Sequence, residues 1–344
     1  MKRFFQAAAF AAALFAAASA APAADPDHPF VPVLEVDFPD PHIVEHKGEF
    51  LAFSTNSGGV NLPVASSRDL VTWTMVMDAA EPKKRHDAMP VLASWVKEGR
   101  TWAPEVIALG DRWLLYYTAH HGKKDRQCVG VAVAADPRGP FRDASAEPLV
   151  CQDDEGGSID ASPFRDADGQ LYLYFKNDGN AVRKTTQLWA QRLAPDGMST
   201  VGAPVALARN DKKWEAHVVE SPTMVKTPTG YTLLYSANHY GWEDHQRLSP
   251  YAMGYALCDG PMGPCRKAEG NPVLYSYSDR TAGCLSGPGH QTVFEGRGRA
   301  FIAFHGWAAT PACRKLDNRR YMYIAPLGWK DGKPVIAPSL RAPK

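Results

Sequence analysis

The amino-acid sequence predicts an all-β fold, a five-bladed β-propeller of four-stranded blades. Three observations support this prediction. A short apolar strand recurs five times, at intervals of about 60 residues. A second apolar run precedes each copy, and turn residues separate the strands throughout. A generic β-sandwich is the alternative, but the repeat extends over the whole mature chain, which favours a closed ring.

Each unit opens with an apolar run that we expect to form the innermost strand, followed by a hairpin to the second strand. The innermost runs begin at Pro41, Ala103, Asp160, Ser221 and His290. The second strands are the clearest copies of the repeat, over residues 49–54, 112–117, 170–175, 231–236 and 299–304. A Gly or Asp shortly before each second strand is the turn residue that a hairpin needs. Two outer strands complete each unit, with turns that include Asp136-Pro137, Asp259-Gly260 and Asp331-Gly332.

The N-terminus predicts export. Lys2 and Arg3 precede an apolar stretch over residues 4–18, and small residues suited to signal peptidase follow. We therefore expect residues 1–23 to be a signal peptide and residues 24–344 to be one propeller domain. A membrane anchor is the alternative, but the apolar stretch is short, so we expect a secreted or periplasmic protein without a membrane association after signal removal.

Cysteine usage agrees with export. The chain has six cysteines, which can pair in 15 ways. Proximity in the sequence favours Cys128–Cys151, Cys258–Cys265 and Cys284–Cys313. No Cys-x-x-Cys occurs, so neither a zinc ribbon nor a redox motif is indicated.

Charge and motifs narrow the partners. The formal net charge is +1, from 38 basic and 37 acidic residues, and no long basic run is present, so nucleic acid is not an expected partner. No Gly-x-Ser-x-Gly, P-loop or Gly-x-Gly-x-x-Gly occurs, and the histidines lack zinc spacing. We expect no organic cofactor and a monomeric protein.

The candidate site lies where the five innermost strands begin. These strand starts carry Asp40, Trp102, Asp160, Glu220 and His290. Because equivalent positions of a propeller face one another across its axis, we expect these side chains to share a central pocket. Asp-Pro is also a common turn opening, so Asp40 alone would be structural; the recurrence at equivalent blade positions favours function.

Three carboxyl groups in one pocket indicate acid–base chemistry. Like charges at close range raise the pKa of at least one group, which provides one acid and one base near neutral pH. Hydrolysis of a glycosidic bond needs that combination: one group protonates the leaving oxygen and the other activates water.

The motifs around these residues resemble glycoside hydrolase family 43. They are Phe38-Pro-Asp-Pro, Thr101-Trp-Ala-Pro-Glu, Ile159-Asp-Ala-Ser-Pro, Val219-Glu-Ser-Pro and Gly287-Pro-Gly-His. The resemblance implies a five-bladed propeller and an inverting α-L-arabinofuranosidase, arabinanase or β-xylosidase. The third motif has Asp-Ala-Ser-Pro in place of the commoner Asp-Pro-Ser-Pro but keeps the carboxylate.

The resemblance also implies roles. Asp40 corresponds to the general base, Asp160 to the residue that modulates pKa, and Glu220 to the general acid. Trp102 corresponds to an aromatic that stacks on the sugar, and Arg320, more loosely, to an arginine of the substrate pocket. The family histidine matched by His290 often neighbours a calcium ion; alternatively, His290 hydrogen-bonds a carboxylate directly.

Polar residues at the ends of the second strands complete the candidates. Asn177 is expected to contact sugar hydroxyls, although a polar strand end is more often only solvated. The leading hypothesis is an inverting exo-glycosidase that releases arabinose or a related pentose from plant polysaccharide, with Glu220 kept protonated by Asp160. The alternatives are a β-xylosidase and a non-catalytic carbohydrate-binding propeller.

Overall fold

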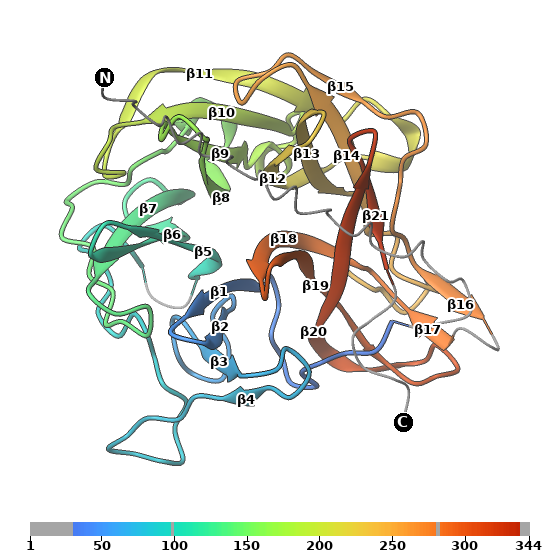
Figure 1. The fold of residues 1–344 in the computed structure, drawn as a ribbon, viewed down its shortest axis with the longest axis horizontal. Coiled ribbons are helices and arrows are strands. Elements are labelled where there is room, and N and C mark those ends of the chain that lie inside the picture. The colour runs from blue at the N-terminus through green and yellow to red at the C-terminus, as the bar shows by residue number, and fades with distance from the viewer. Residues whose placement is uncertain (1–29, 98–99, 280–282, 338–344) are drawn as a thin grey trace, which may run out of the picture.

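Five antiparallel sheets surround a central axis in the computed structural model, which describes residues 30–97, 100–279 and 283–337. The strands β1, β5, β8, β12 and β18 lie innermost, and later strands of each sheet lie progressively outward (Figure 1). The predicted five-bladed propeller is therefore confirmed. The predicted signal peptide at residues 1–23 lies outside the described residues.

Four sheets have the predicted four strands. The first contains β1 (His42–His46), β2 (Glu49–Phe53), β3 (Val64–Ser67) and β4 (Thr74–Met75). The third contains β8 (Ser158–Arg165), β9 (Leu171–Asn177), β10 (Gln187–Leu193) and β11 (Thr200–Arg209). The fourth contains β12 (Val219–Thr227), β13 (Gly230–Ala237), β14 (Ala252–Cys258) and β15 (Cys265–Lys267). The fifth contains β18 (Gly289–Gly296), β19 (Arg299–Ala309), β20 (Lys315–Lys330) and β21 (Lys333–Ile336).

The second sheet differs from the prediction because it has three strands. These are β5 (Trp102–Leu109), β6 (Arg112–His121) and β7 (Arg126–Ala134). The segment that follows β7 carries Pro137, Pro140 and Pro148, and proline cannot donate to a strand ladder. Only single bridges, such as Val133 with Arg142, mark the expected fourth strand. A hairpin of β16 (Tyr277–Asp279) and β17 (Gly283–Leu285) lies between the fourth and fifth blades.

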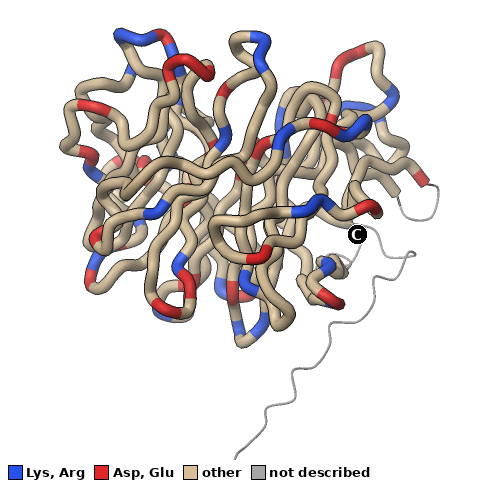
Figure 2. The backbone as a smooth tube through the Cα atoms, turned by 90° about the horizontal axis from the view of Figure 1, so that it is seen from above, with Lys and Arg blue, Asp and Glu red and all other residues tan. Residues whose placement is uncertain are grey.

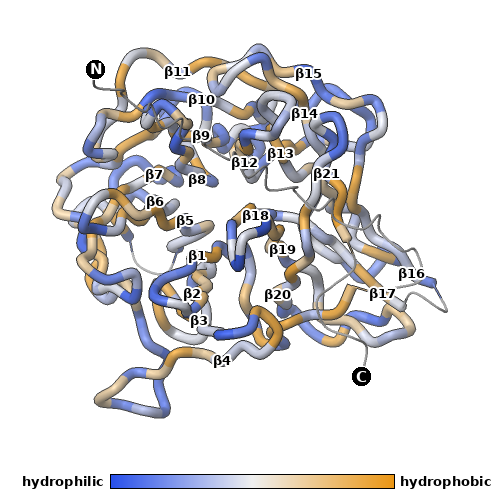
Figure 3. The backbone as a smooth tube through the Cα atoms, in the orientation of Figure 1, coloured by the Kyte–Doolittle hydropathy of each residue, from blue (hydrophilic) through white to orange (hydrophobic). Residues whose placement is uncertain are grey.

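The apolar core is divided into five clusters, each between two neighbouring blades. Strand β6 shows the reason: Leu115 and Tyr117 pack toward the first blade, and Leu114 and Tyr116 pack toward the third. Both faces of the strand are buried, so its sequence is a continuous apolar run. Figure 3 shows such hydrophobic stretches along strands of the blades.

Every innermost strand has a non-glycine residue in the left-handed region within two residues of its first residue. These residues are Asp40 (φ 55°), Ala103 (φ 46°), Asp160 (φ 58°), Ser221 (φ 52°) and His290 (φ 50°). In blades two to five a register shift, as in a β-bulge, lies at the same place. The repeat therefore places Ser221 and Ala103, rather than Glu220 and Trp102, at the positions equivalent to Asp40, Asp160 and His290.

The ring closes through the two ends of the chain. The main-chain nitrogens of Val33 and Phe38 donate to the carbonyls of Met322 and Arg320 on β20, both at 2.9 Å. Thr292 on β18 donates to the carbonyl of Pro41 at 2.8 Å. These contacts join the first blade to the fifth and bring residues from distant parts of the sequence to one side of the axis.

The disulfide prediction is confirmed for all three pairs. The structure joins Cys128 to Cys151, Cys258 to Cys265, and Cys284 to Cys313. Charged residues of both signs are interspersed in the view of Figure 2. No helix in the described part of the chain is long and apolar enough to cross a membrane.

Candidate active site

A pocket of about 470 Å³ opens where the innermost strands begin. Six of the seven predicted site residues line it: Asp40, Trp102, Asp160, Glu220, His290 and Arg320. Its wall is completed by residues that include Thr55, Lys176, Asp178, Tyr240, Tyr251 and His305. The predicted convergence of the strand starts on one pocket is what the structure shows.

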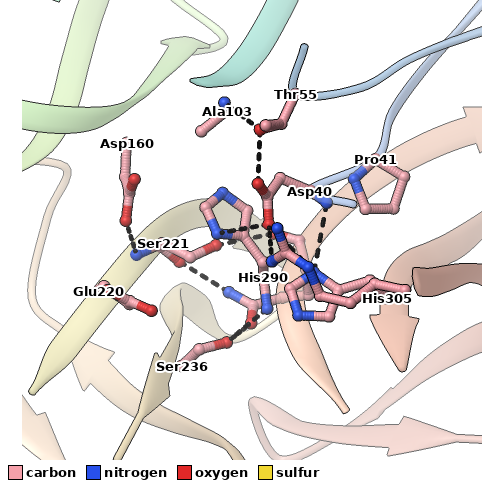
Figure 4. Close-up of polar contacts among 12 residues, drawn as sticks. Asp40, Pro41, Thr55, Ala103, Asp160, Glu220, Ser221, Ser236, His290 and His305 are labelled. Atoms are coloured by element: carbon pink, nitrogen blue, oxygen red, sulfur yellow. Dashed lines mark hydrogen bonds and ion pairs between the residues drawn. The ribbon is translucent and has the colours of Figure 1, made fainter. Parts of the chain in front are cut away.

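Asp40 is buried among hydrogen-bond donors (Figure 4). Its Oδ2 accepts a hydrogen bond of 2.5 Å from the Thr55 hydroxyl, which in turn accepts one of 2.8 Å from the main-chain nitrogen of Ala103. Its Oδ1 lies 3.0 Å from Nη1 of Arg320. Nδ1 of His305 and Nδ1 of His290 lie 3.1 Å and 3.4 Å from the same oxygen.

These partners determine the charge of Asp40. Burial raises the pKa of this carboxyl, but Arg320 and His290 more than offset that effect, so its pKa lies well below the ordinary value. Burial and Arg320 lower the pKa of His305 to about 4, so this imidazole is neutral. Asp40 is therefore ionised at neutral pH, as a general base must be.

Asp160 and Glu220 lie together on the other side of the pocket. Oδ2 of Asp160 accepts a hydrogen bond of 3.0 Å from the main-chain nitrogen of Ser221, the residue after Glu220. The Tyr251 hydroxyl donates to Oε1 of Glu220 at 2.7 Å, and the Lys176 ammonium donates to Oε2 at 3.1 Å. Figure 4 shows Asp160 directed at Ser221, with the Glu220 side chain beside it.

The two carboxyl groups differ in proton affinity, and the order differs from the one we expected. Burial raises the pKa of Asp160 to about 6, and the charge of Glu220 adds to this rise. Burial also favours the neutral form of Glu220, but Lys176, His290 and Tyr251 outweigh it and lower the pKa. The expectation that Asp160 keeps Glu220 protonated is wrong for the unliganded protein, because sequence reasoning did not place an ammonium beside Glu220.

Asn177 does not line the pocket. It is 1% exposed, and its amide nitrogen donates to the carbonyl of Thr185 at 3.0 Å. Its amide oxygen accepts a hydrogen bond of 2.6 Å from the main-chain nitrogen of Gln187. The position therefore does not support the predicted sugar contact. Since side chains alternate along a strand, the neighbours Lys176 and Asp178 face the pocket instead.

Sequence reasoning missed several residues of the site. Lys176 could have been recognised from the sequence, because it is a single lysine in the apolar run of β9. A lysine in a buried strand needs a charged partner, and the carboxyl groups of the site are such partners. Tyr251 lies just before β14 and carried no such signal. Tyr240 also lines the pocket, and the centre of its ring lies 5.2 Å from the Arg320 guanidinium.

The described residues do not by themselves fit a calcium ion. Calcium takes six to eight oxygen ligands, whereas no group of three or more His, Cys, Asp or Glu in the described ranges is arranged to hold a metal. Nδ1 of His290 is directed at Asp40. We therefore derive no step from a metal ion.

An ionised carboxylate facing two carboxyl groups that differ in proton affinity, in a pocket on a propeller axis, is the arrangement of an enzyme that hydrolyses O-glycosyl bonds. The family model described as "Glycosyl hydrolases family 43" matches residues 30–334. The chain belongs to glycoside hydrolase family 43, as the motifs indicated.

Relatives of known activity support this assignment. The chain is 25% identical to "Extracellular endo-alpha-(1->5)-L-arabinanase 2" of Bacillus subtilis (strain 168), over 88% of this chain and 71% of that protein. It is 23% identical to the "Xylosidase/arabinosidase" of Butyrivibrio fibrisolvens, over 90% of this chain and 56% of that protein. It is 28% identical to "Beta-D-galactofuranosidase xynD" of Aspergillus niger, over 70% of this chain and 64% of that protein.

Solved structures share the fold. A "thermostable family-43 glycoside hydrolase" superimposes with a TM-score of 0.74 and 26% identity, over 92% of this chain and 98% of that one. An endo-1,4-beta-xylanase from Bacteroides thetaiotaomicron gives a TM-score of 0.71 and 27% identity, over 90% of this chain and 99% of that one.

Proposed function

We propose that this glycoside hydrolase is an exported, inverting enzyme that releases arabinose or a related pentose from arabinan, arabinoxylan or similar plant polysaccharides. The observation that carries the proposal is the division of the pocket into an ionised Asp40 and a protonatable Asp160–Glu220 pair. The arabinanase and the xylosidase/arabinosidase among its relatives favour pentose substrates. Trp102, at the pocket wall, offers an aromatic face to the apolar face of a sugar.

The proposed mechanism has one displacement. Asp40 takes a proton from water, and the water oxygen attacks the anomeric carbon as the bond to the leaving oxygen breaks. When substrate is bound, the proton of the Asp160–Glu220 pair passes to Glu220, which delivers it to that oxygen. Asp160, whose pKa is about 6, holds the proton that the pair shares in the unliganded protein. Arg320, which lies 3.0 Å from Asp40, keeps the base ionised and orients it.

A panel of substrates tests the function. We expect hydrolysis of 4-nitrophenyl α-L-arabinofuranoside or of linear arabinan. Faster hydrolysis of 4-nitrophenyl β-D-xyloside would favour a β-xylosidase, the activity that the xylosidase/arabinosidase relative supports. The β-D-galactofuranoside belongs in the panel because of the Aspergillus niger relative. Failure to cleave any pentoside would overturn the proposed substrate class.

Product stereochemistry tests the mechanism. An inverting enzyme first releases the sugar in the anomeric configuration opposite to that of the substrate, which NMR detects before mutarotation. Initial release of the retained anomer would overturn the assignment of Asp40 as base.

Export and calcium are separate proposals. Three disulfides are typical of proteins that fold in oxidising compartments, and the arabinanase relative is named extracellular. Mass spectrometry of the mature N-terminus tests export. Calcium held near His290 through water stays a proposal, which metal analysis before and after EDTA treatment tests.

A further inference from the structure

Lys176 occupies a position that carries a hydrogen-bond acceptor in the other four blades. On each second strand, this position pairs with the residue before the left-handed residue of the innermost strand. In blade order the five residues are Thr55, Thr118, Lys176, Ser236 and His305.

The four acceptors contact the next blade. The main-chain nitrogen of Ala103 lies 2.8 Å from Oγ1 of Thr55, and that of Asp160 lies 3.1 Å from Oγ1 of Thr118. The main-chain nitrogen of His290 lies 2.8 Å from Oγ of Ser236. That of Asp40 lies 3.2 Å from Nδ1 of His305. Each contact gives a hydrogen-bond acceptor to the main-chain nitrogen of the left-handed residue in the next blade.

Lys176 cannot make this contact, because an ammonium only donates. The main-chain nitrogen of Ser221, which a third-blade acceptor would satisfy, donates instead to Oδ2 of Asp160 at 3.0 Å. This one change in the repeat thus has two effects. Lys176 makes no contact with the Ser221 main-chain nitrogen, and Asp160 is hydrogen-bonded to the residue that follows Glu220.

The freed ammonium is buried against the acid. Only 1% of the Lys176 side chain is exposed, and Nζ lies 3.1 Å from Oε2 of Glu220 and 3.9 Å from Oδ1 of Asp178. With the Tyr251 hydroxyl on Oε1, both oxygens of Glu220 have a fixed donor. A buried ammonium requires a carboxylate partner, so at least one neighbouring carboxyl must stay ionised.

We propose that Lys176 is a positioning residue for the acid Glu220: its ammonium fixes one carboxylate oxygen and holds the Asp160–Glu220 pair at one shared proton. The role in catalysis rests on the function proposed above. Without the ammonium, two adjacent buried carboxyls would both take up protons, and Glu220 would be a weaker acid with a less defined orientation.

Other charged groups also act on the pair. Glu220 faces Lys176 on β9, Asp160 on β8, His290 on β18 and Tyr251 before β14, and Asp178 lies beside Lys176. Burial opposes the charge of Lys176, but Glu220, Asp160 and Asp178 together raise the pKa of this lysine. Arg126 acts on Asp178 from the neighbouring blade. Lys176 is nevertheless the cation at hydrogen-bond distance from Glu220.

The repeat itself suggests the test variant. Lys176→Thr places at this position the side chain that Thr55 and Thr118 already use. Its hydroxyl can accept the hydrogen bond of the Ser221 main-chain nitrogen, as the two threonines do for their own neighbouring blades. Lys226→Met is the matched control, because Lys226 forms an ion pair of 2.8 Å with Asp166 where β12 and β8 end, away from the strand starts that line the pocket. Thermal unfolding of both variants establishes that they fold.

The first readout is the pH dependence of kcat/KM. Removal of an opposite charge in contact with a carboxyl raises its pKa by about 1–3 units, so the basic limb should move upward by that amount in Lys176→Thr. The limb should not move in Lys226→Met. The second readout needs no activity. Carbon-13 NMR of protein labelled at the glutamate carboxyls measures the titration midpoint of Glu220, whose signal is assigned by comparison with Glu220→Gln.

The outcomes separate the two proposals. An upward shift of the Glu220 titration midpoint in Lys176→Thr supports the role of Lys176, whatever the substrate. If the wild-type enzyme cleaves no pentoside, the proposed substrate class fails while the titration still decides the role of Lys176. A folded Lys176→Thr protein whose Glu220 midpoint and kcat/KM profile match those of the wild type would overturn this inference. If Lys176→Thr does not fold, Asp178→Asn replaces it. This variant removes a negative charge beside Lys176, so the titration midpoint of Glu220 should move downward. An unmoved Glu220 midpoint in Asp178→Asn would overturn the inference.

Discussion

The main-chain nitrogen of Ser221 donates a hydrogen bond of 3.0 Å to Oδ2 of Asp160, so the residue that follows Glu220 is fixed directly to the neighbouring carboxyl. Asp160 and Ser221 are also equivalent left-handed residues of neighbouring blades. The geometry of the Asp160–Glu220 pair is therefore determined by the backbone of the ring, and changes in either strand should appear in the proton affinity of the pair.

The pH dependence of the wild-type enzyme follows from the two halves of the site. The acid must hold a proton, and the pKa of Asp160 is about 6, so kcat/KM should be high below that pH and fall as the pH rises through it. The base must be ionised, and the pKa of Asp40 lies well below its usual value, so activity should persist into acid. A kcat/KM profile that stays flat through the pKa of Asp160, about 6, would contradict this division.

Glu220→Gln should separate substrates by leaving group. Glutamine keeps the shape of the side chain but supplies no acidic proton, so hydrolysis of arabinan, with its poor leaving group, should fall by about 10²–10⁴. A 2,4-dinitrophenyl glycoside needs little protonation and should lose much less. Equal losses for the two substrates in steady-state assays would show that Glu220 is not the acid.

Arg320→Met should alter the acidic limb. Loss of the guanidinium 3.0 Å from Oδ1 raises the pKa of Asp40, so the base becomes protonated at higher pH and the acidic limb of kcat/KM moves upward. Arg319→Met is the control, because Arg319 pairs with the exposed Asp317. The assignment of Arg320 would fail if both variants had the same acidic limb as the wild type.

Glu105→Gln should stabilise the protein at neutral pH. Burial raises the pKa of Glu105 well above 4.5, Ser162 donates to Oε2 at 3.0 Å, and neutral His42 faces the same oxygen. The folded state binds this proton more tightly than the unfolded state. The wild type therefore loses stability as the pH rises from about 4.5 toward the folded pKa, and glutamine removes that loss.

Denaturant titrations at two pH values measure the effect. At pH 7.5 the free energy of unfolding of Glu105→Gln should exceed that of the wild type by about 1 kcal/mol or more, and the difference should shrink toward pH 4. Glu295→Gln, at an exposed position of β18, should show no difference at either pH. A loss of stability in Glu105→Gln at pH 7.5 would mean that Glu105 is ionised in the folded protein.

The architecture and the carboxyl groups could be predicted because they depend on the repeat. Five apolar second strands and five strand starts, four of them polar or charged and one a tryptophan, specify a ring and a pocket, and Asp40, Asp160 and Glu220 converge as expected. The one-residue offset of Glu220 from Asp160 could not be predicted, because only the strand register shows that Ser221, and not Glu220, occupies the position equivalent to Asp160. The lowered pKa of Glu220 depends on Lys176, whose side chain direction only the strand pairing reveals.

The closure of the ring determines when the surroundings of Asp40, the proposed base, can form. Asp40 belongs to the first blade, whereas His290, His305 and Arg320 belong to the last, and the contact between Arg320 and Asp40 joins residues 280 positions apart. A chain emerging from the ribosome can build four blades before any of these partners exists. The surroundings of Asp40 are thus among the last parts of the molecule to assemble, and a protein shortened before β20 would retain Asp40 and the Asp160–Glu220 pair but lack the guanidinium beside Asp40.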